Sequence, residues 1–263
     1  MLRLAANLTF LFTELPMLER FGAAARAGFR GAEILFPYDL AAPELAQAAQ
    51  AADIEFVLMN TPPPNWAGGA RGFAAVPGGE DRFRRDFDRA LRFAQVLRAR
   101  HIHVMAGVAE GPTARQTFLD NLAWACDRAP HASLTIEPLN PLDMPGYFLA
   151  DFDAAAEVLD TLDRPNLGLQ FDAYHAHLIT GDATACLRAH AARVRHVQIA
   201  GVGPAGRVEP SVGPSVEPSP APIDYTAFLR TLADGGYTGW VSAEYVPATV
   251  TTAGLGWMAA LPA

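Results

Sequence analysis

The stretch Ser-Leu-Thr-Ile-Glu-Pro-Leu-Asn at residues 133–140 is a short apolar segment that runs into a carboxylate and then a proline. Proline has no amide hydrogen, and it disfavours helical backbone in the residue before it. Pro138 therefore predicts that a strand ends at Glu137 and leaves this carboxylate at its tip.

Three later segments have the same form, a short apolar-rich strand with an oxygen-bearing side chain at its carboxyl end. They are residues 167–172, 194–198 and 240–244, which end in Asp172, Gln198 and Glu244. Four such strand ends suggest one shared site, provided that the strands lie side by side and point the same way.

The whole chain alternates strand-like and helix-like segments eight times. We expect strands at residues 2–7, 31–36, 54–59, 101–105, 133–137, 167–172, 194–199 and 239–244, and helices at residues 16–27, 43–52, 80–100, 113–128, 151–162, 182–192, 224–233 and 252–261. This alternation implies a parallel α/β sheet, and eight units match a single (β/α)₈ TIM barrel over residues 1–263. The alternative is an open, doubly wound sheet. Its two exposed edges and the missing glycine-rich dinucleotide motif weigh against it.

Composition excludes several classes of protein. The 263 residues are 51% hydrophobic and 18% charged, which indicates a soluble globular protein, and the net charge of −8 gives no support for nucleic-acid binding. All 20 basic residues are arginine, so Schiff-base lysine chemistry and a P-loop are excluded. No apolar run is long enough to span a membrane, and no signal peptide is evident. Cys126 and Cys186 are expected to be reduced and buried in helices, which suits a cytoplasmic protein.

A barrel brings the carboxyl ends of its strands to one face. Glu137, Asp172, Gln198 and Glu244 then become neighbours, although each alone would pass for a solvated surface group. Crowded carboxylates repel one another unless a cation neutralises them. Oxygen ligands favour a hard ion, so the expected cofactor is Mg²⁺ or Mn²⁺.

Three other residues are candidates for binding substrate. His175 follows Asp172 by three residues and would lie just above the metal, unless it packs against its own loop. Arg71 and Arg207 lie in long glycine- and proline-rich loops, where a guanidinium can grip a carboxylate. Ordinary surface arginines are the alternative. The remaining histidines show no ligand-like grouping.

Both long loops have further features. Trp66 and Phe73, in the loop at residues 60–79, form either an apolar lid or part of the core. Residues 201–222 are expected to be irregular, and Val-Glu-Pro-Ser occurs there twice, at residues 208–211 and 216–219.

Two glutamates on one metal indicate enediolate chemistry. A metal-bound α-hydroxycarbonyl compound loses a C–H proton to one glutamate, and a proton returns to the adjacent carbon of the cis-enediolate. Isomerisation and epimerisation differ only in where that proton returns.

The chain resembles the hydroxypyruvate isomerase family, within the xylose-isomerase-like barrel superfamily that also holds the ketose 3-epimerases and endonuclease IV. The motifs that carry the resemblance are Phe29–Glu33 with Phe36–Asp39, Asn65–Trp66 with Arg71–Gly72, Ile136–Asn140, Gln170–Asp172 with Tyr174–His175, His196–Ala200, and Gly239–Trp240 with Glu244–Tyr245. The resemblance implies that Glu137, Asp172, Gln198 and Glu244 bind the metal and that the two glutamates act as acid and base. Glutamine at position 198 is typical of this branch.

The loop after the seventh strand departs from the family pattern. Two segments could match the family's arginine-containing run, namely Arg207-Val208-Glu209-Pro210 and Ser215-Val216-Glu217-Pro218. Arg207 can bind the substrate as the family's arginine does only if the first segment is the matching one. The expected activity is the isomerisation of a small anionic substrate, hydroxypyruvate, to tartronate semialdehyde. The protein is expected to act as a monomer or as a homo-oligomer. The alternatives are a 2-oxo-tetronate isomerase, a ketose 3-epimerase and a non-catalytic sugar-binding barrel. An endonuclease IV-like enzyme would need a histidine-rich zinc cluster.

Overall fold

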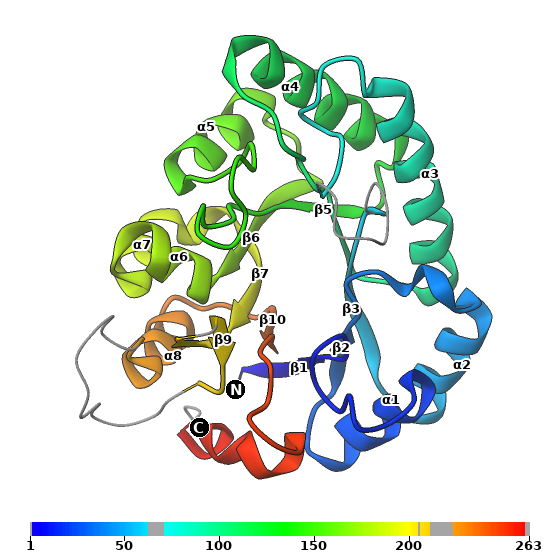
Figure 1. Cartoon of the computed structure of the whole chain (residues 1–263), viewed down its shortest axis with the longest axis vertical. Coiled ribbons are helices and arrows are strands. Elements are labelled where there is room, and N and C mark those ends of the chain that lie inside the picture. Colours follow the sequence, from blue (N-terminus) through cyan, green and yellow to red (C-terminus); the bar gives the residue numbers. More distant parts are fainter. Residues whose placement is uncertain (1, 63–70, 205, 211–222, 261–263) are drawn as a thin grey trace.

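The computed structural model describes residues 2–62, 71–204, 206–210 and 223–260. Eight parallel strands close into a barrel in the order β1-β10-β7-β6-β5-β4-β3-β2, with helices around them (Figure 1). The strands are β1 (Arg3–Asn7), β2 (Gly31–Glu33), β3 (Glu55–Asn60), β4 (His101–His103), β5 (Ser133–Ile136), β6 (Leu167–Asp172), β7 (Val194–Ile199) and β10 (Trp240–Ala243). The predicted TIM barrel is confirmed, and the open sheet is excluded.

The outer layer follows the predicted order of helices. It consists of α1 (Met17–Arg26), α2 (Ala42–Ala51), α3 (Glu80–Leu97), α4 (Gly111–Arg128), α5 (Phe152–Leu162), α6 (Ala173–Thr180), α7 (Ala183–His190) and α8 (Tyr225–Asp234), with 3₁₀ helices η1 (Pro37–Asp39), η2 (Ala191–Arg193) and η3 (Thr251–Ala260). None of the helices in the described part of the chain is long and apolar enough to cross a membrane.

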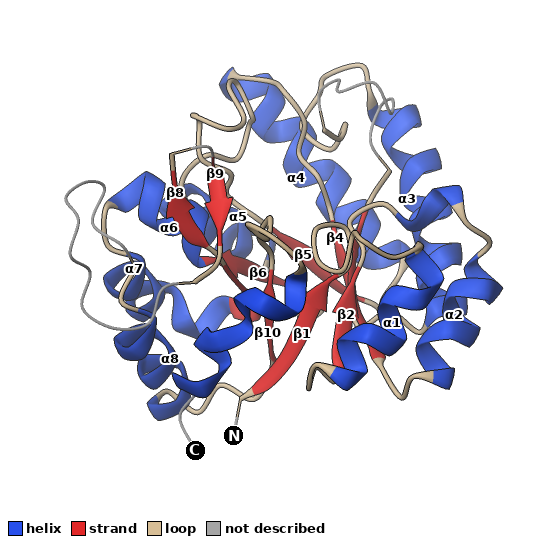
Figure 2. Cartoon of the chain, turned by 60° about the horizontal axis from the view of Figure 1, so that its bottom comes forward, coloured by secondary structure: helices blue, strands red, loops and turns tan. Residues whose placement is uncertain are grey.

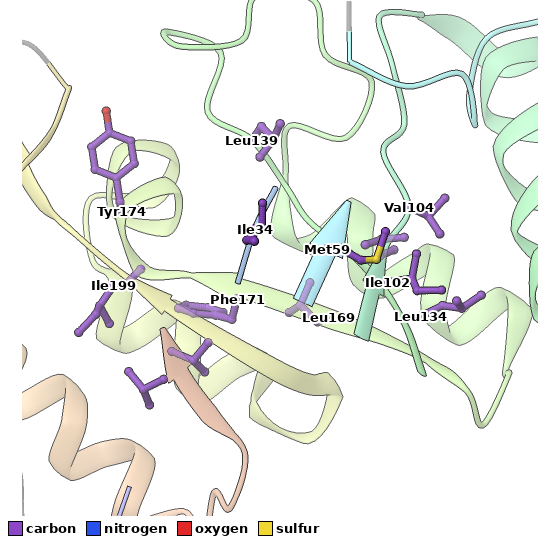
Figure 3. Packing of buried hydrophobic residues seen from close by; sticks show 14 of the residues in the cluster. Ile34, Met59, Ile102, Val104, Leu134, Leu139, Leu169, Phe171, Tyr174 and Ile199 are labelled. Atoms are coloured by element: carbon purple, nitrogen blue, oxygen red, sulfur yellow. The ribbon is translucent and has the colours of Figure 1, made fainter. Parts of the chain in front are cut away.

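Strand β6 shows how the barrel separates apolar from polar side chains. Successive residues of a strand point to opposite faces. Leu169 and Phe171 lie in the apolar core between strands and helices, where the Phe171 ring is 5.1 Å from that of Phe152 on α5 (Figure 3). Gln170 and Asp172 alternate with them and point into the barrel. The apolar core therefore surrounds a polar interior at the carboxyl end of this strand.

A hairpin and a helix of the structure were not predicted. Part of the segment expected to be irregular forms an antiparallel hairpin of β8 (Gly201–Gly203) and β9 (Gly206–Val208), which stands near α6 (Figure 2). Gly206, with φ of +110°, makes its turn possible. Helix α6 begins directly after β6, because the Asp172 carboxylate accepts the Tyr174 N–H at 2.8 Å and caps the helix.

Two strands end two or three residues earlier than predicted. Strand β2 ends at Glu33 instead of residue 36, after an irregularity between Ala32 and Glu33, and β4 ends at His103 instead of residue 105. The early end of β2 has a chemical consequence, because it puts the Glu33 carboxylate at a strand tip. The last helix is also of a different type, since η3 is a 3₁₀ helix.

Candidate functional site

The four predicted metal ligands come together at the carboxyl ends of adjacent strands. Glu137 follows β5, Asp172 ends β6, Gln198 lies on β7 and Glu244 follows β10. Their exposed fractions are 5%, 0%, 0% and 6%, respectively. The strand order, not closeness in sequence, makes these residues neighbours.

The donor atoms suit a hard divalent cation. One ligand atom each from Glu137, Asp172 and His175 lies within 4.8 Å of the other two. Asp172 Oδ2 is buried, and Nη2 of Arg207 lies 2.6 Å from it as its ion-pair partner. Carboxylate and amide oxygens are the ligands that Mg²⁺ and Mn²⁺ prefer.

A cavity of about 190 Å³ opens beside these residues. Its lining consists of Phe10, Leu35, Asn60, Arg71, His103, Met105, Glu137, Leu139, Asp143, Met144, Gln170, His175, Arg207 and Glu244. Both predicted acid–base residues and all three predicted substrate-binding residues therefore border one small space. Asp172 and Gln198 are fully buried and do not line it.

Gln170 links the predicted ligands on β5 and β7. Its Nε2 donates to Glu137 Oε2 at 2.9 Å and to Gln198 Oε1 at 2.8 Å. Its own Oε1 accepts the hydroxyl of Thr135 at 3.1 Å. These bonds fix which end of the Gln170 amide faces the carboxylate.

A second set of hydrogen bonds joins Glu244 to Glu33. Gln198 Nε2 donates to Glu244 and, at 3.0 Å, to Glu33 Oε2. Asn7 Nδ2 also donates to both, at 2.9 and 3.1 Å, respectively. The other oxygen of Glu33 contacts Nε2 of His196. Two carboxylates thus share two amide donors in the barrel interior.

Sequence reasoning missed Glu33, Asn7 and Gln170. Glu33 was hidden because its strand was expected to continue to residue 36, which placed the carboxylate in mid-strand. The signal for Gln170 was the two-residue period of the strand, which puts it on the same face as Asp172. That period also puts His196 on the same face of β7 as Gln198.

Arg207 enters the site from β9. Its Nη2 lies 2.6 Å from Asp172 Oδ2, 3.6 Å from Glu244 Oε1 and 2.7 Å from His175 Nε2. Its guanidinium also lies over the Tyr174 ring, 4.4 Å from the centroid. Burial opposes the charge, but Asp172 and Glu244 outweigh it and raise the pKa of Arg207 above its usual value. Arg207 is therefore a cation held among the carboxylates.

The hairpin holds the first of the two competing segments, residues 207–210, at the site. Arg207 pairs with Val202 across β8 and β9, and its carbonyl accepts the Val246 N–H at 3.3 Å. Glu209 Oε1 accepts the Ala248 N–H at 2.8 Å and connects the hairpin to the loop after β10. The second competing segment, residues 215–218, lies outside the described residues.

Hydrogen bonds hold the His175 ring on both sides. Asn140 Oδ1 accepts the N–H groups of Leu142 and Asp143 at 3.1 and 3.0 Å, which fixes the orientation of the Asn140 amide. The Asn140 backbone N–H and Nδ2 both face His175 Nδ1, at 3.1 and 2.7 Å. The guanidinium of Arg207 faces the other ring nitrogen, Nε2, at 2.7 Å. Burial, with Arg207, lowers the pKa of His175 to about 3, so the ring is neutral between these donors.

The other loop contributes less to the described site. Arg71 lines the cavity and is exposed, with its guanidinium 5.9 Å from the Phe36 ring centroid. Phe73 packs against the core and does not line the cavity, which favours the core alternative over a lid. Trp66 lies outside the described residues.

The crowded carboxylates have unequal pKa values. Burial and the charges of Asp172 and Glu244 raise the pKa of Glu137 well above its usual value. Burial also raises the pKa of Glu244, to about 8, although Arg207 opposes the shift. Burial pushes the pKa of Asp172 upward too, but Arg207 and His175 outweigh it, so the net shift is downward. The pKa values of Glu137 and Glu244 are thus shifted upward, and that of the neighbouring Asp172 is shifted downward.

Comparisons with known proteins agree with this fold. Residues 21–261 match the family model described as xylose isomerase-like TIM barrel. A 2-oxo-tetronate isomerase of Cupriavidus necator is 42% identical over 262 residues, which cover 97% of each chain. The hydroxypyruvate isomerase of Escherichia coli is 36% identical, with 98% of each chain covered. A Brucella melitensis crystal structure, named as an AP endonuclease of family 2, has a TM-score of 0.88 and 40% identity, with 98% of each chain covered.

A family match over most of the chain and full-length relatives at these identities agree with the closed barrel and its polar centre. This chain belongs to the xylose isomerase-like TIM barrel family, among its hydroxypyruvate isomerase and 2-oxo-tetronate isomerase relatives.

Proposed function

We propose that the chain is an isomerase of short hydroxy-oxo acids that interconverts hydroxypyruvate and tartronate semialdehyde. The observation that carries this proposal is that two buried glutamates and two arginines line one small cavity. Glu137 and Glu244 are the proton carriers. Arg71 and Arg207 provide the positive charge that a carboxylate substrate needs. The similarity to the Escherichia coli hydroxypyruvate isomerase supports the same reaction.

The site is suited to a divalent cation, Mg²⁺ or Mn²⁺. Its holders would be Glu137, Asp172, Gln198 and Glu244. When bound, the ion would polarise the substrate carbonyl and stabilise negative charge on the neighbouring oxygens.

The proton transfers fall to the two glutamates. One of them removes a proton from C3 of hydroxypyruvate, which leaves a cis-enediolate. The hydroxyl proton moves from O3 to O2, and a glutamate returns a proton to C2, so that tartronate semialdehyde forms. The raised pKa values of Glu137 and Glu244 suit carboxyl groups that must both take up and release protons near neutral pH.

The substrate carboxylate is held at the edge of the cavity. Arg207 Nη2 and His175 Nε2 lie there, 2.7 Å apart. The guanidinium of Arg207 would donate to a carboxylate oxygen of the substrate. The distance to the glutamates is short, because Arg207 already lies 3.6 Å from Glu244.

A second candidate is 2-oxo-tetronate isomerisation, which uses the same atoms on a substrate that is one carbon longer. It is favoured by the 42% identity to the Cupriavidus necator enzyme of that name. DNA cleavage, which the name of the Brucella melitensis structure suggests, is not proposed. The net charge is −8, and the cation-binding group found among the described residues contains a single histidine.

The decisive experiment incubates purified protein with Mn²⁺ in deuterated water and follows each acid by proton NMR. We expect isomerisation, with deuterium incorporated at the reacting carbon. A preference for one acid in kcat/KM decides between the two substrates. Absence of both turnover and exchange, in protein shown to bind Mn²⁺, would refute the isomerase.

A further inference from the structure

Glu33 is a buried carboxylate that takes no part in the proposed proton transfers. It is 0% exposed, sits at the tip of β2 and does not line the cavity. Three side chains contact it, namely His196, Asn7 and Gln198. So many contacts on one buried group suggest a specific task.

The contact with Gln198 fixes the direction of an amide. A glutamine side chain has a donor end and an acceptor end of nearly equal size, so its neighbours decide which end points where. Nε2 of Gln198 donates to Glu33 and Glu244, and Oε1 faces the opposite way, 2.8 Å from Gln170 Nε2. The same Gln170 nitrogen is bonded to Glu137. The Gln198 oxygen therefore points toward the side of the barrel that holds Glu137.

We propose that Glu33 is a positioning residue that orients the Gln198 amide and turns its oxygen toward the side of the barrel that holds Glu137. This inference rests on the proposed function, because it takes Gln198 as a ligand. If the amide were reversed, its NH₂ group would face the Glu137 side, and its oxygen would face the carboxylates of Glu33 and Glu244. Second-layer partners of metal ligands commonly control affinity in this way.

Substitutions at position 33 separate an acceptor role from a simple charge effect. Glu33→Gln keeps the length and one acceptor oxygen but loses the charge. Glu33→Asp keeps the charge, but its carboxylate is one methylene further from Gln198. Glu33→Asn lacks both the length and the charge.

Mn²⁺ affinity of the metal-free protein, measured by isothermal titration calorimetry, is the readout. If an acceptor oxygen close to Gln198 orients its amide, Glu33→Gln should bind Mn²⁺ more tightly than the two variants with shorter side chains, Glu33→Asp and Glu33→Asn. The short variants should lose about 10- to 100-fold in affinity, as second-layer substitutions typically do. Ser242→Ala is the matched control, because its hydroxyl is buried on β10 and makes no hydrogen bond. It should bind Mn²⁺ as the unmodified chain does.

Two results would overturn the proposal. If Glu33→Asp binds Mn²⁺ more tightly than Glu33→Gln, charge alone matters, and unchanged affinity in all three variants means that Glu33 orients nothing. If Glu33→Asp does not fold, Glu33→Gln and Glu33→Asn can be compared instead, because both are neutral and differ only in the length of the side chain. Failure of the unmodified chain to bind Mn²⁺ would instead contradict the proposed cation site, so the two failures are distinguishable.

Discussion

The interior of the site and its rim are built differently. The interior network, made of Asn7, Glu33, Gln170 and Gln198, stands on barrel strands, and its members are at most 1% exposed. The rim, made of His175 and Arg207, stands on the first turn of α6 and on a three-residue strand outside the barrel. The barrel thus fixes the groups that we propose hold the cation and move protons. Added segments bring the groups that meet the substrate's charge.

The two regions also differ in what holds them. Each barrel strand pairs with neighbours on both sides, so the interior side chains start from a rigid frame. A two-stranded hairpin is marginal by itself and depends on its contacts. Here those contacts are the backbone bond from Val246 to Arg207 and the Ala248 bond to Glu209. Changes to the interior should therefore affect turnover, and changes to the rim should affect substrate binding.

The largest effect is expected from removing a proton carrier. Glu137→Gln and Glu244→Gln keep the shape of the side chain but cannot take up a proton. We expect kcat to fall by about 10²- to 10⁴-fold, the usual contribution of a general acid or base. Steady-state kinetics with hydroxypyruvate measure this, with circular dichroism as the check on folding. Full activity in either variant would remove that glutamate from the proposed role.

A smaller effect, mainly on KM, is expected at the rim. Arg207→Ala removes the charge-assisted hydrogen bond to the substrate carboxylate, so KM should rise by about 10- to 100-fold, with a lesser change in kcat. Arg207→Lys should recover part of this loss, because the charge remains while the planar group is lost. An equal fall in kcat with KM unchanged would show that the rim acts on the chemical step instead.

The pH dependence of cation binding tests the interior. Glu244 has a pKa raised to about 8, and it must lose its proton before it can bind a cation. Mn²⁺ affinity should therefore rise with pH, by up to about tenfold per unit, and level off above this pKa. Calorimetric titrations below and above this pH measure it. Affinity that is already constant below this pH would mean that Glu244 is ionised before the cation binds, or is not a ligand.

The smallest effect on activity is expected away from both regions. Asp182 caps α7 by accepting the N–H groups of Thr184 and Ala185 at 3.0 and 2.9 Å. Asp182→Ala should lower the free energy of unfolding by about 1 kcal/mol and leave kcat and KM unchanged. Asp182→Asn, which keeps an acceptor, should recover most of that stability. Chemical denaturation provides the measurement, and altered kinetics would show that α7 influences the rim.

Much of the fold could be read from local patterns. Pro138 marked the end of β5, and the alternation of short apolar segments with amphipathic helices led to the closed barrel. The extra helix α6 escaped prediction because its cap is Asp172, a residue already interpreted as a ligand at a strand end. The hairpin escaped because glycine- and proline-rich composition indicates irregular backbone, whereas β8 and β9 are held by contacts with the loop after β10.

The sequence predicted the site residues that lie at the ends of predicted strands, and it did not predict those that lie elsewhere. Glu137, Asp172, Gln198 and Glu244 share a recognisable position, so one rule found all four. Glu33 shares this position only because β2 stops early at an irregularity, which no local pattern indicated.

The sequence by itself determined the order of strands and helices and the chemical types of the groups at the strand ends, since both follow from local periodicity and residue chemistry. Only the tertiary structure decided the partners. It placed Arg207 against Asp172, His175 against Asn140, and Glu33 against Gln198. These pairings link residues far apart in the chain, and their geometry depends on barrel closure and on side-chain packing, which local sequence does not encode.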